Sequence, residues 1–276
     1  MLATLQAGAQ TAPDSTWQYH GDPWDPWYIN DFQTLVFADN ATVRAAPDRT
    51  ANKIATLPIA TAVTVLTHDT ARLTLDGRTH CWHQISWKDG NRAPQTGWIW
   101  GGLLAAGGAT IPNGVILLGC MKGKISGRRP GFRYEVRIVQ EGRLTTSYEL
   151  PEVIPGESQI MRFEVTGARG LSNVDHVVHF TWAEAMCGGI SSEFYLLQKG
   201  NSLHALPVLT TNGEMGIGQE QRYIFPDERA TVEYSLPLLY FYEKPENASA
   251  LLRYTAISSG DENGGSVKVE VEKVRY

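Results

Sequence analysis

Five short segments decide the fold of this chain: ATVRAAP at 41–47, KIATL at 53–57, VTVL at 63–66, WHQI at 82–85 and GWIW at 97–100. Each is rich in β-branched or aromatic residues, and turn-forming residues lie between them. Strands this short bury a common core only by curling into a barrel or a sandwich. The sequence therefore predicts a small barrel over residues 35–104.

The order of these segments resembles the bacterial SH3-like (SH3b) family, whose pattern runs approximately L-N-V-R-x-x-P, V-I-x-x-L, G-x-x-V-x-V, W-x-K-V and G-W-V. The resemblance implies that Trp82 and Trp98 fill the barrel and that Arg44 reaches a nearby carbonyl or carboxylate. Ala60 departs from the pattern, because the family usually has a turn glycine there.

Two loops also depart from the family pattern, since the segments 68–80 and 89–96 are longer than a minimal domain needs. Such loops line the face where these domains take ligands. The resemblance therefore does not predict how this chain binds a ligand.

The remainder of the chain predicts a second β domain. Residues 105–114, AAGGATIPNG, combine small residues with glycine and proline and predict a linker. Over 115–276, apolar runs alternate with turns, and no long stretch has a helical period. We expect an all-β fold, with the SH3-like barrel followed by a larger antiparallel β-sandwich-like domain. The segments 186–207 and 221–228 are similar to C-terminal parts of secreted bacterial proteins with one SH3-like domain, a resemblance that brings no catalytic residues.

Composition narrows the function classes. The 276 residues are 42% hydrophobic and 19% charged, with a formal net charge of −5, which favours a core-forming protein and disfavours nucleic acid as a partner. No apolar stretch is long enough to span a bilayer. Residues 1–10 resemble the end of a signal peptide, although no basic region precedes them, so either the start is truncated or the pattern is accidental. We expect a periplasmic or secreted protein.

An aromatic arm occupies residues 11–34, and its prolines forbid a helix interior. Its aromatic rings either pack against a neighbouring domain or form a surface that stacks on carbohydrate. Trp24, Trp27 and Tyr28 are therefore candidate ligand-binding residues, together with Trp87 and Trp100 of the barrel segment.

The three cysteines are too few for a disulfide framework and lack the spacing of a structural zinc site. Cys120 and Cys187 form a candidate disulfide in an oxidising compartment, with Cys81 alone in the barrel. The alternative is three buried thiols that act as small hydrophobic residues.

No catalytic constellation stands out. Cys187 is followed by glycines, which fits a turn or a disulfide end better than a nucleophile. His176 and His179 lie three residues apart in a predicted strand, so their side chains point to opposite faces and are badly placed to bind the same metal ion. His204 follows on a separate run, and residues 261–265 (DENGG) lack the spaced carboxylates of a calcium loop. We expect no catalytic site, no metal and no cofactor.

The sequence thus favours an exported cell-envelope binding module whose SH3-like domain recognises peptidoglycan, another wall component or an envelope protein. The assignment to the envelope comes from the resemblance alone. Two alternatives stay open: a cell-wall hydrolase or amidase with a cryptic C-terminal site, and a periplasmic inhibitor or immunity protein. The sequence does not give the oligomeric state.

Overall fold

The computed structural model describes residues 16–18, 31–90, 93–126, 129–150, 154–155, 158–184, 191–214, 217–228, 251–259 and 266–276. These residues form β-strands and two short 3-10 turns, with no α-helix among them. The all-β prediction is confirmed. The chain divides into two compact units, Met1–Gln159 and Ile160–Tyr276.

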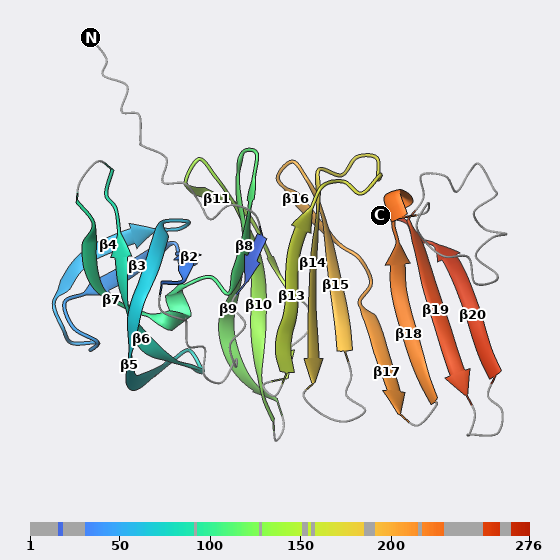
Figure 1. The fold of residues 1–276 in the computed structure, drawn as a ribbon, viewed down its shortest axis with the longest axis horizontal. Coiled ribbons are helices and arrows are strands. Elements are labelled where there is room, and N and C mark those ends of the chain that lie inside the picture. Colours follow the sequence, from blue (N-terminus) through green and yellow to red (C-terminus); the bar gives the residue numbers. More distant parts are fainter. Residues whose placement is uncertain are drawn as a thin grey trace, which may run out of the picture. The chain divides into compact units, whose positions relative to one another are not determined.

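The first unit begins with a curled, six-stranded half-barrel, in which the strands are ordered β2-β5-β6-β7-β3-β4 and all neighbours are antiparallel (Figure 1, blue to teal). The predicted segments between residues 35 and 104 fall on its strands. The bounds are β2 (Gln33–Leu35), β3 (Asn40–Arg44), β4 (Lys53–Pro58), β5 (Ala62–Leu75), β6 (Arg78–Trp87) and β7 (Gln95–Trp100).

Alternation along each strand builds the core of the half-barrel. Val43, Ile85 and Ile99 are fully buried, while their chain neighbours point to the opposite face. The cluster that they belong to consists of Val36, Ala41, Val43, Leu57, Val63, Val65, Ile85, Trp87, Ile99 and Leu104.

The segment 68–80, expected to be a long loop, is instead the tip of the β5–β6 hairpin. The two strands are joined at Asp76 and Gly77, both at positive φ (51° and 73°), which is the backbone that an Asp-Gly hairpin turn supplies. Ala60 also adopts a positive φ, 62°. The turn before β5 therefore has a left-handed backbone conformation that glycine adopts more readily than alanine.

A second antiparallel sheet in the same unit follows the order β1-β8-β9-β10-β11, and β12 pairs with β10. A short 3-10 turn, η1 (Gly101–Leu103), leads into it from the half-barrel. Its strands are β1 (Thr16–Gln18), β8 (Gly107–Ile111), β9 (Gly114–Ser126), β10 (Arg129–Gln140), β11 (Arg143–Glu149) and β12 (Ile154–Pro155).

The segment 105–114 therefore contains a paired strand rather than an open connection. β8 bonds to β9 and β1, with Ala109 and Ile111 buried. The half-barrel and the second sheet also share a buried cluster of Leu35, Phe37, Ile59, Ala105, Val115, Leu117 and Val139. Because of this shared core, residues on both sides of 105–114 belong to one compact unit, and the division of the chain follows Gln159.

The second unit holds one antiparallel sheet ordered β13-β14-β15-β17-β18-β19-β20, with β16 paired to β15. Its strands are β13 (Ser158–Thr166), β14 (His176–Glu184), β15 (Ser191–Lys199), β16 (Ser202–Ala205), β17 (Leu209–Glu214), β18 (Ile217–Ile224), β19 (Leu252–Ser259) and β20 (Ser266–Lys273); a 3-10 turn, η2 (Pro226–Glu228), follows β18.

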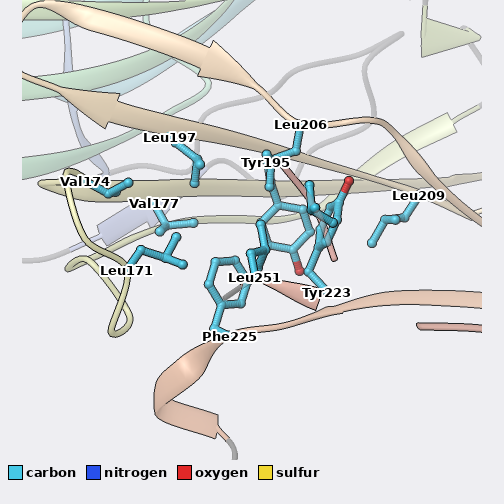
Figure 2. Close-up of a cluster of buried hydrophobic side chains, with 11 residues drawn as sticks. Leu171, Val174, Val177, Tyr195, Leu197, Leu206, Leu209, Tyr223, Phe225 and Leu251 are labelled. Carbon is cyan, nitrogen blue, oxygen red and sulfur yellow. The ribbon is translucent and has the colours of Figure 1, made fainter. Parts of the chain in front are cut away.

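Aromatic side chains anchor the core of this second unit. Figure 2 shows Tyr195 close to Tyr223 and Phe225, with ring centroids 5.2 Å and 5.7 Å from that of Tyr195. Leucine and valine side chains from β14, β15, β17 and neighbouring loops pack in the same cluster as the three rings. Among the residues that the structure describes, no helix is long and apolar enough to cross a membrane.

Candidate functional site

The five aromatic residues predicted to bind a ligand do not form one site in the structure. Trp24, Trp27 and Tyr28 lie outside the described residues, so their role stays a prediction. Trp87 and Trp100 are 4% and 2% exposed. Neither of these two rings offers a face to solvent, and the structure gives no support for a stacking role.

Trp100 is held by polar groups at the tip of the β5–β6 hairpin. Its indole N–H donates to the Leu73 carbonyl oxygen at 3.0 Å. The Arg78 guanidinium lies over the ring, 5.0 Å from a ring centroid, and the His80 ring meets it edge-on at 5.2 Å. Burial, with the charge of Arg78, lowers the pKa of His80 to about 3. These contacts give Trp100 a structural role within the folded half-barrel.

Cys81 and His83 form a buried pair on the other face of β6. The Cys81 Sγ lies 3.4 Å from the His83 Nε2, and the two residues are 2% and 0% exposed. Burial, together with the charge of His68, lowers the pKa of His83 to about 3. A thiolate–imidazolium pair is disfavoured there because both charged forms lose their hydration. The pair is a packed core element.

Cys120 lies half-buried on β9, whereas Cys187 falls outside the described residues. The proposed disulfide between them therefore remains a prediction. Intact mass before and after reduction tests it directly.

The two tryptophans expected to fill the half-barrel behave differently. Trp82 is 5% exposed, so its predicted burial is confirmed. Trp98 is only half-buried, since Gly97 and Ile99 face the core and alternation turns Trp98 outward. Neither tryptophan belongs to the barrel core cluster, in which Trp87 takes the aromatic position.

A row of polar side chains flanks Trp98 on the outer face of the curled sheet. Trp98 is in register with Arg44 of β3 on one side and with Gln84 of β6 on the other. Continuing outward, Arg44 is in register with Lys53 of β4, and Gln84 with Thr67 of β5. We call these five residues, Lys53–Arg44–Trp98–Gln84–Thr67, the Trp98 row.

A parallel row lies two residues away along β7 and β6 and, across a bulge, three residues away along β5. It consists of Thr96 of β7, Ser86 of β6, Thr64 of β5 and Gln33 of β2. All nine side chains of the two rows are half-buried or exposed. Arg44 also donates from Nη1 to the Ala51 carbonyl oxygen at 2.7 Å, which confirms the carbonyl contact expected of it.

This face combines the groups that bind a sugar ring or a peptide plane. The indole of Trp98 supplies an apolar surface, and amide and hydroxyl side chains around it donate and accept hydrogen bonds. Sequence inspection missed this arrangement because Trp98 was assigned to the core. The signal that reveals it is the strict alternation of Gly97, Trp98 and Ile99.

The histidines of the second unit are engaged by neighbouring side chains. His176 Nδ1 lies 2.8 Å from Gln198 Oε1, and His179 Nε2 lies 3.1 Å from Glu193 Oε2. Gln198 is the register neighbour of His176, whereas Glu193 lies two residues along β15 from Tyr195, the register neighbour of His179. The two histidines therefore face opposite sides of the sheet, as their spacing predicted. The Tyr195 hydroxyl donates to the same Glu193 oxygen at 3.0 Å, and its ring stacks on His179 at 4.2 Å.

Glu193 is the charged centre of this group. Burial opposes its ionisation, but the hydrogen bonds from His179 and Tyr195 and the charges of His179 and Arg162 together hold the pKa of Glu193 below its usual value. The cluster therefore carries a stable carboxylate that its own neighbours satisfy. His204 lies on β16 with an exposed side chain.

Within the described ranges, no group of three or more histidine, cysteine, aspartate or glutamate side chains could hold a metal ion. Comparison with known proteins found no matching family model, no matching curated protein and no matching solved structure.

Proposed function

We propose that this chain is an exported, periplasmic or secreted cell-envelope binding module whose half-barrel is an SH3-like domain that recognises a wall component. One observation carries the proposal: the half-buried Trp98 lies in a row of polar side chains on a sheet face whose other side is a fully packed core. The order of the sequence motifs on the strands supports the SH3-like assignment. On this proposal binding requires no catalytic group.

A wall component is favoured over an envelope protein by the composition of the face. Protein interfaces usually centre on several buried apolar anchors. The two rows contain a single aromatic residue among hydroxyl, amide and cationic side chains. Flexible glycopeptide chains, which offer sugar faces, amides and hydroxyls, match such a surface better.

Co-sedimentation of the full chain with purified peptidoglycan sacculi tests the proposal. Trp98→Ala and Gln84→Ala should each weaken binding, the former by about 5- to 30-fold, as expected for loss of about 1–2 kcal/mol at an aromatic anchor. Leu144→Ala is the matched control, because Leu144 is 37% exposed on β11, outside the half-barrel.

Circular dichroism and melting temperature should show that the variants stay folded. Wild-type protein that fails to sediment with sacculi refutes the proposal. Release of soluble fragments from the sacculi would instead support the hydrolase alternative.

A further inference from the structure

We infer that the wall ligand is acidic: a carboxylate of the glycopeptide lies against Arg44 and Lys53 while a sugar or peptide plane lies on Trp98. This inference rests on the proposed function and specifies the ligand chemistry of the same face. The two cations lie at one end of the Trp98 row.

A bulge brings the two cations side by side. Val43 is in register with Ala55, but the next residue, Arg44, is in register with Lys53, so Ile54 is the extra residue of β4. A Cβ on Gly97 would lie 2.6 Å from the Ile54 Cδ1, so the tip of Ile54 lies near Gly97, although the residue is 49% exposed. The bulge thus places Lys53, rather than Ile54, next to Arg44 in the Trp98 row.

The two cations are within reach of a ligand that rests on Trp98. Adjacent strands lie about 4.8 Å apart, so Arg44 is one such step from Trp98 and Lys53 is two steps, about 10 Å. That span corresponds to a sugar ring with one acidic substituent. β4 forms the edge of the sheet, where long side chains can move to meet the substituent.

Arg44 is oriented before any ligand arrives. Its Nη1 donates to the Ala51 carbonyl oxygen at 2.7 Å, which fixes the guanidinium near the β3–β4 turn. The other guanidinium N–H groups can still donate to a carboxylate in the paired geometry that arginine favours.

Charge complementarity points to an anion. The two rows hold two cations and no carboxylate. One acidic group interacts electrostatically with Arg44 from the β3–β4 turn, the Asp48 carboxylate. Its Oδ1 already accepts from the Thr50 N–H at 2.6 Å and from the Thr50 hydroxyl at 2.8 Å.

The Asp48 charge therefore weakens the attraction of Arg44 for an acidic ligand but does not prevent Arg44 from binding one. The Thr50 hydrogen bonds, and to a lesser extent Arg44, hold the pKa of Asp48 below its usual value, so it stays ionised. An acidic ligand competes with this charge for Arg44. Removing the Asp48 charge should accordingly strengthen binding.

The test uses the full chain and two preparations of sacculi, native and with carboxyl groups converted to neutral amides. Native sacculi should bind more tightly, and salt should weaken only that binding, since ion pairs at an exposed face are screened. Arg44→Met should weaken binding to native sacculi about tenfold and Lys53→Met about two- to fivefold, as for a paired arginine and an exposed lysine contact.

Asp48→Asn keeps the oxygen that Thr50 requires and should tighten binding by about two- to fivefold, the range of one exposed charge interaction. Arg143→Met is the matched control, because Arg143 is exposed on β11 outside the half-barrel and should not change binding.

The outcomes separate the inference from the proposed function. If Trp98→Ala weakens binding but carboxyl blocking and Lys53→Met do not, the wall proposal survives and the acidic-ligand inference fails. If wild-type protein binds neither preparation, the proposed function fails. Equal affinity for duplex DNA would also overturn the inference, because the cations would then act as a general polyanion site.

Discussion

Arg137 offers a sharp test of what joins the half-barrel to the second sheet of the first unit. Its side chain is only 9% exposed, and its Nε lies 2.9 Å from the Oε2 of Glu135, which is 11% exposed. Its Nη1 donates to the Phe37 carbonyl oxygen at 2.8 Å and to Asp39 at 2.9 Å. The guanidinium also lies 4.3 Å above the Phe37 ring.

Arg137→Met keeps an unbranched side chain but removes the cation. The main cost is the buried Glu135 carboxylate left without its partner, about 3–5 kcal/mol. The Phe37 carbonyl loses a donor, which adds about 1 kcal/mol. Asp39 is 64% exposed and adds little. The expected loss of unfolding free energy is therefore about 4–6 kcal/mol, the sum of these terms.

Urea unfolding followed by tryptophan fluorescence measures this loss. Arg133→Met is the control, because its ion pair with Glu149 joins groups that are 31% and 55% exposed and should cost less than about 1 kcal/mol. The double variant Glu135→Gln/Arg137→Met should recover at least half of the loss, since no charge is left buried. The reasoning is refuted if Arg137→Met costs no more than Arg133→Met.

Two further predictions concern the half-barrel. Gly97→Ala places a Cβ 2.6 Å from the Val43 Cγ1 and the Ile54 Cδ1, so it should cost about 1–3 kcal/mol, partly recovered by adding Ile54→Ala, in the same urea assay. Acid should destabilise the fold through His80 and His83. Their pKa values of about 3 lie below the ordinary 6.5, so the unfolded chain binds the protons first and stability falls as pH drops from 6.5 towards 3. The two groups together contribute up to about 3 kcal/mol per pH unit, and His83→Leu should halve that contribution in pH-dependent unfolding; an unchanged slope would contradict the assignment.

The strand segments of the half-barrel could be predicted from sequence because alternation and turn chemistry are local signals. The Asp76-Gly77 pair carried a hairpin signal of the same kind, although the segment around it was interpreted as a loop. The pairing of β8 could not be anticipated in this way. Glycines 107 and 108 give a linker composition, and only the long-range partner β9 makes that segment a strand.

The candidate site was harder to predict because its members are far apart in sequence. Arg44, Gln84 and Trp98 meet only through the register of three strands. A register shift of one residue would exchange Trp98 with Ile99 and put the tryptophan in the core. The sequence motifs predicted Trp98 as an aromatic core residue, whereas Trp87 is the tryptophan of the buried core cluster.

Three consecutive residues of β7 consequently have different roles: Gly97 and Ile99 contribute to stability, and Trp98 contributes to the proposed binding. Gly97 and Ile99 contribute to the packed side, where Ile99 is fully buried and Gly97 leaves no room for a Cβ. Trp98 contributes to the opposite side, where its row neighbours are polar. Gly97→Ala should therefore lower stability while the folded fraction still binds sacculi. Trp98→Ala should instead leave stability nearly unchanged and weaken binding. If both substitutions lowered stability and binding in parallel, Trp98 would be a core residue. That result would refute the proposal that the outer face is the binding surface.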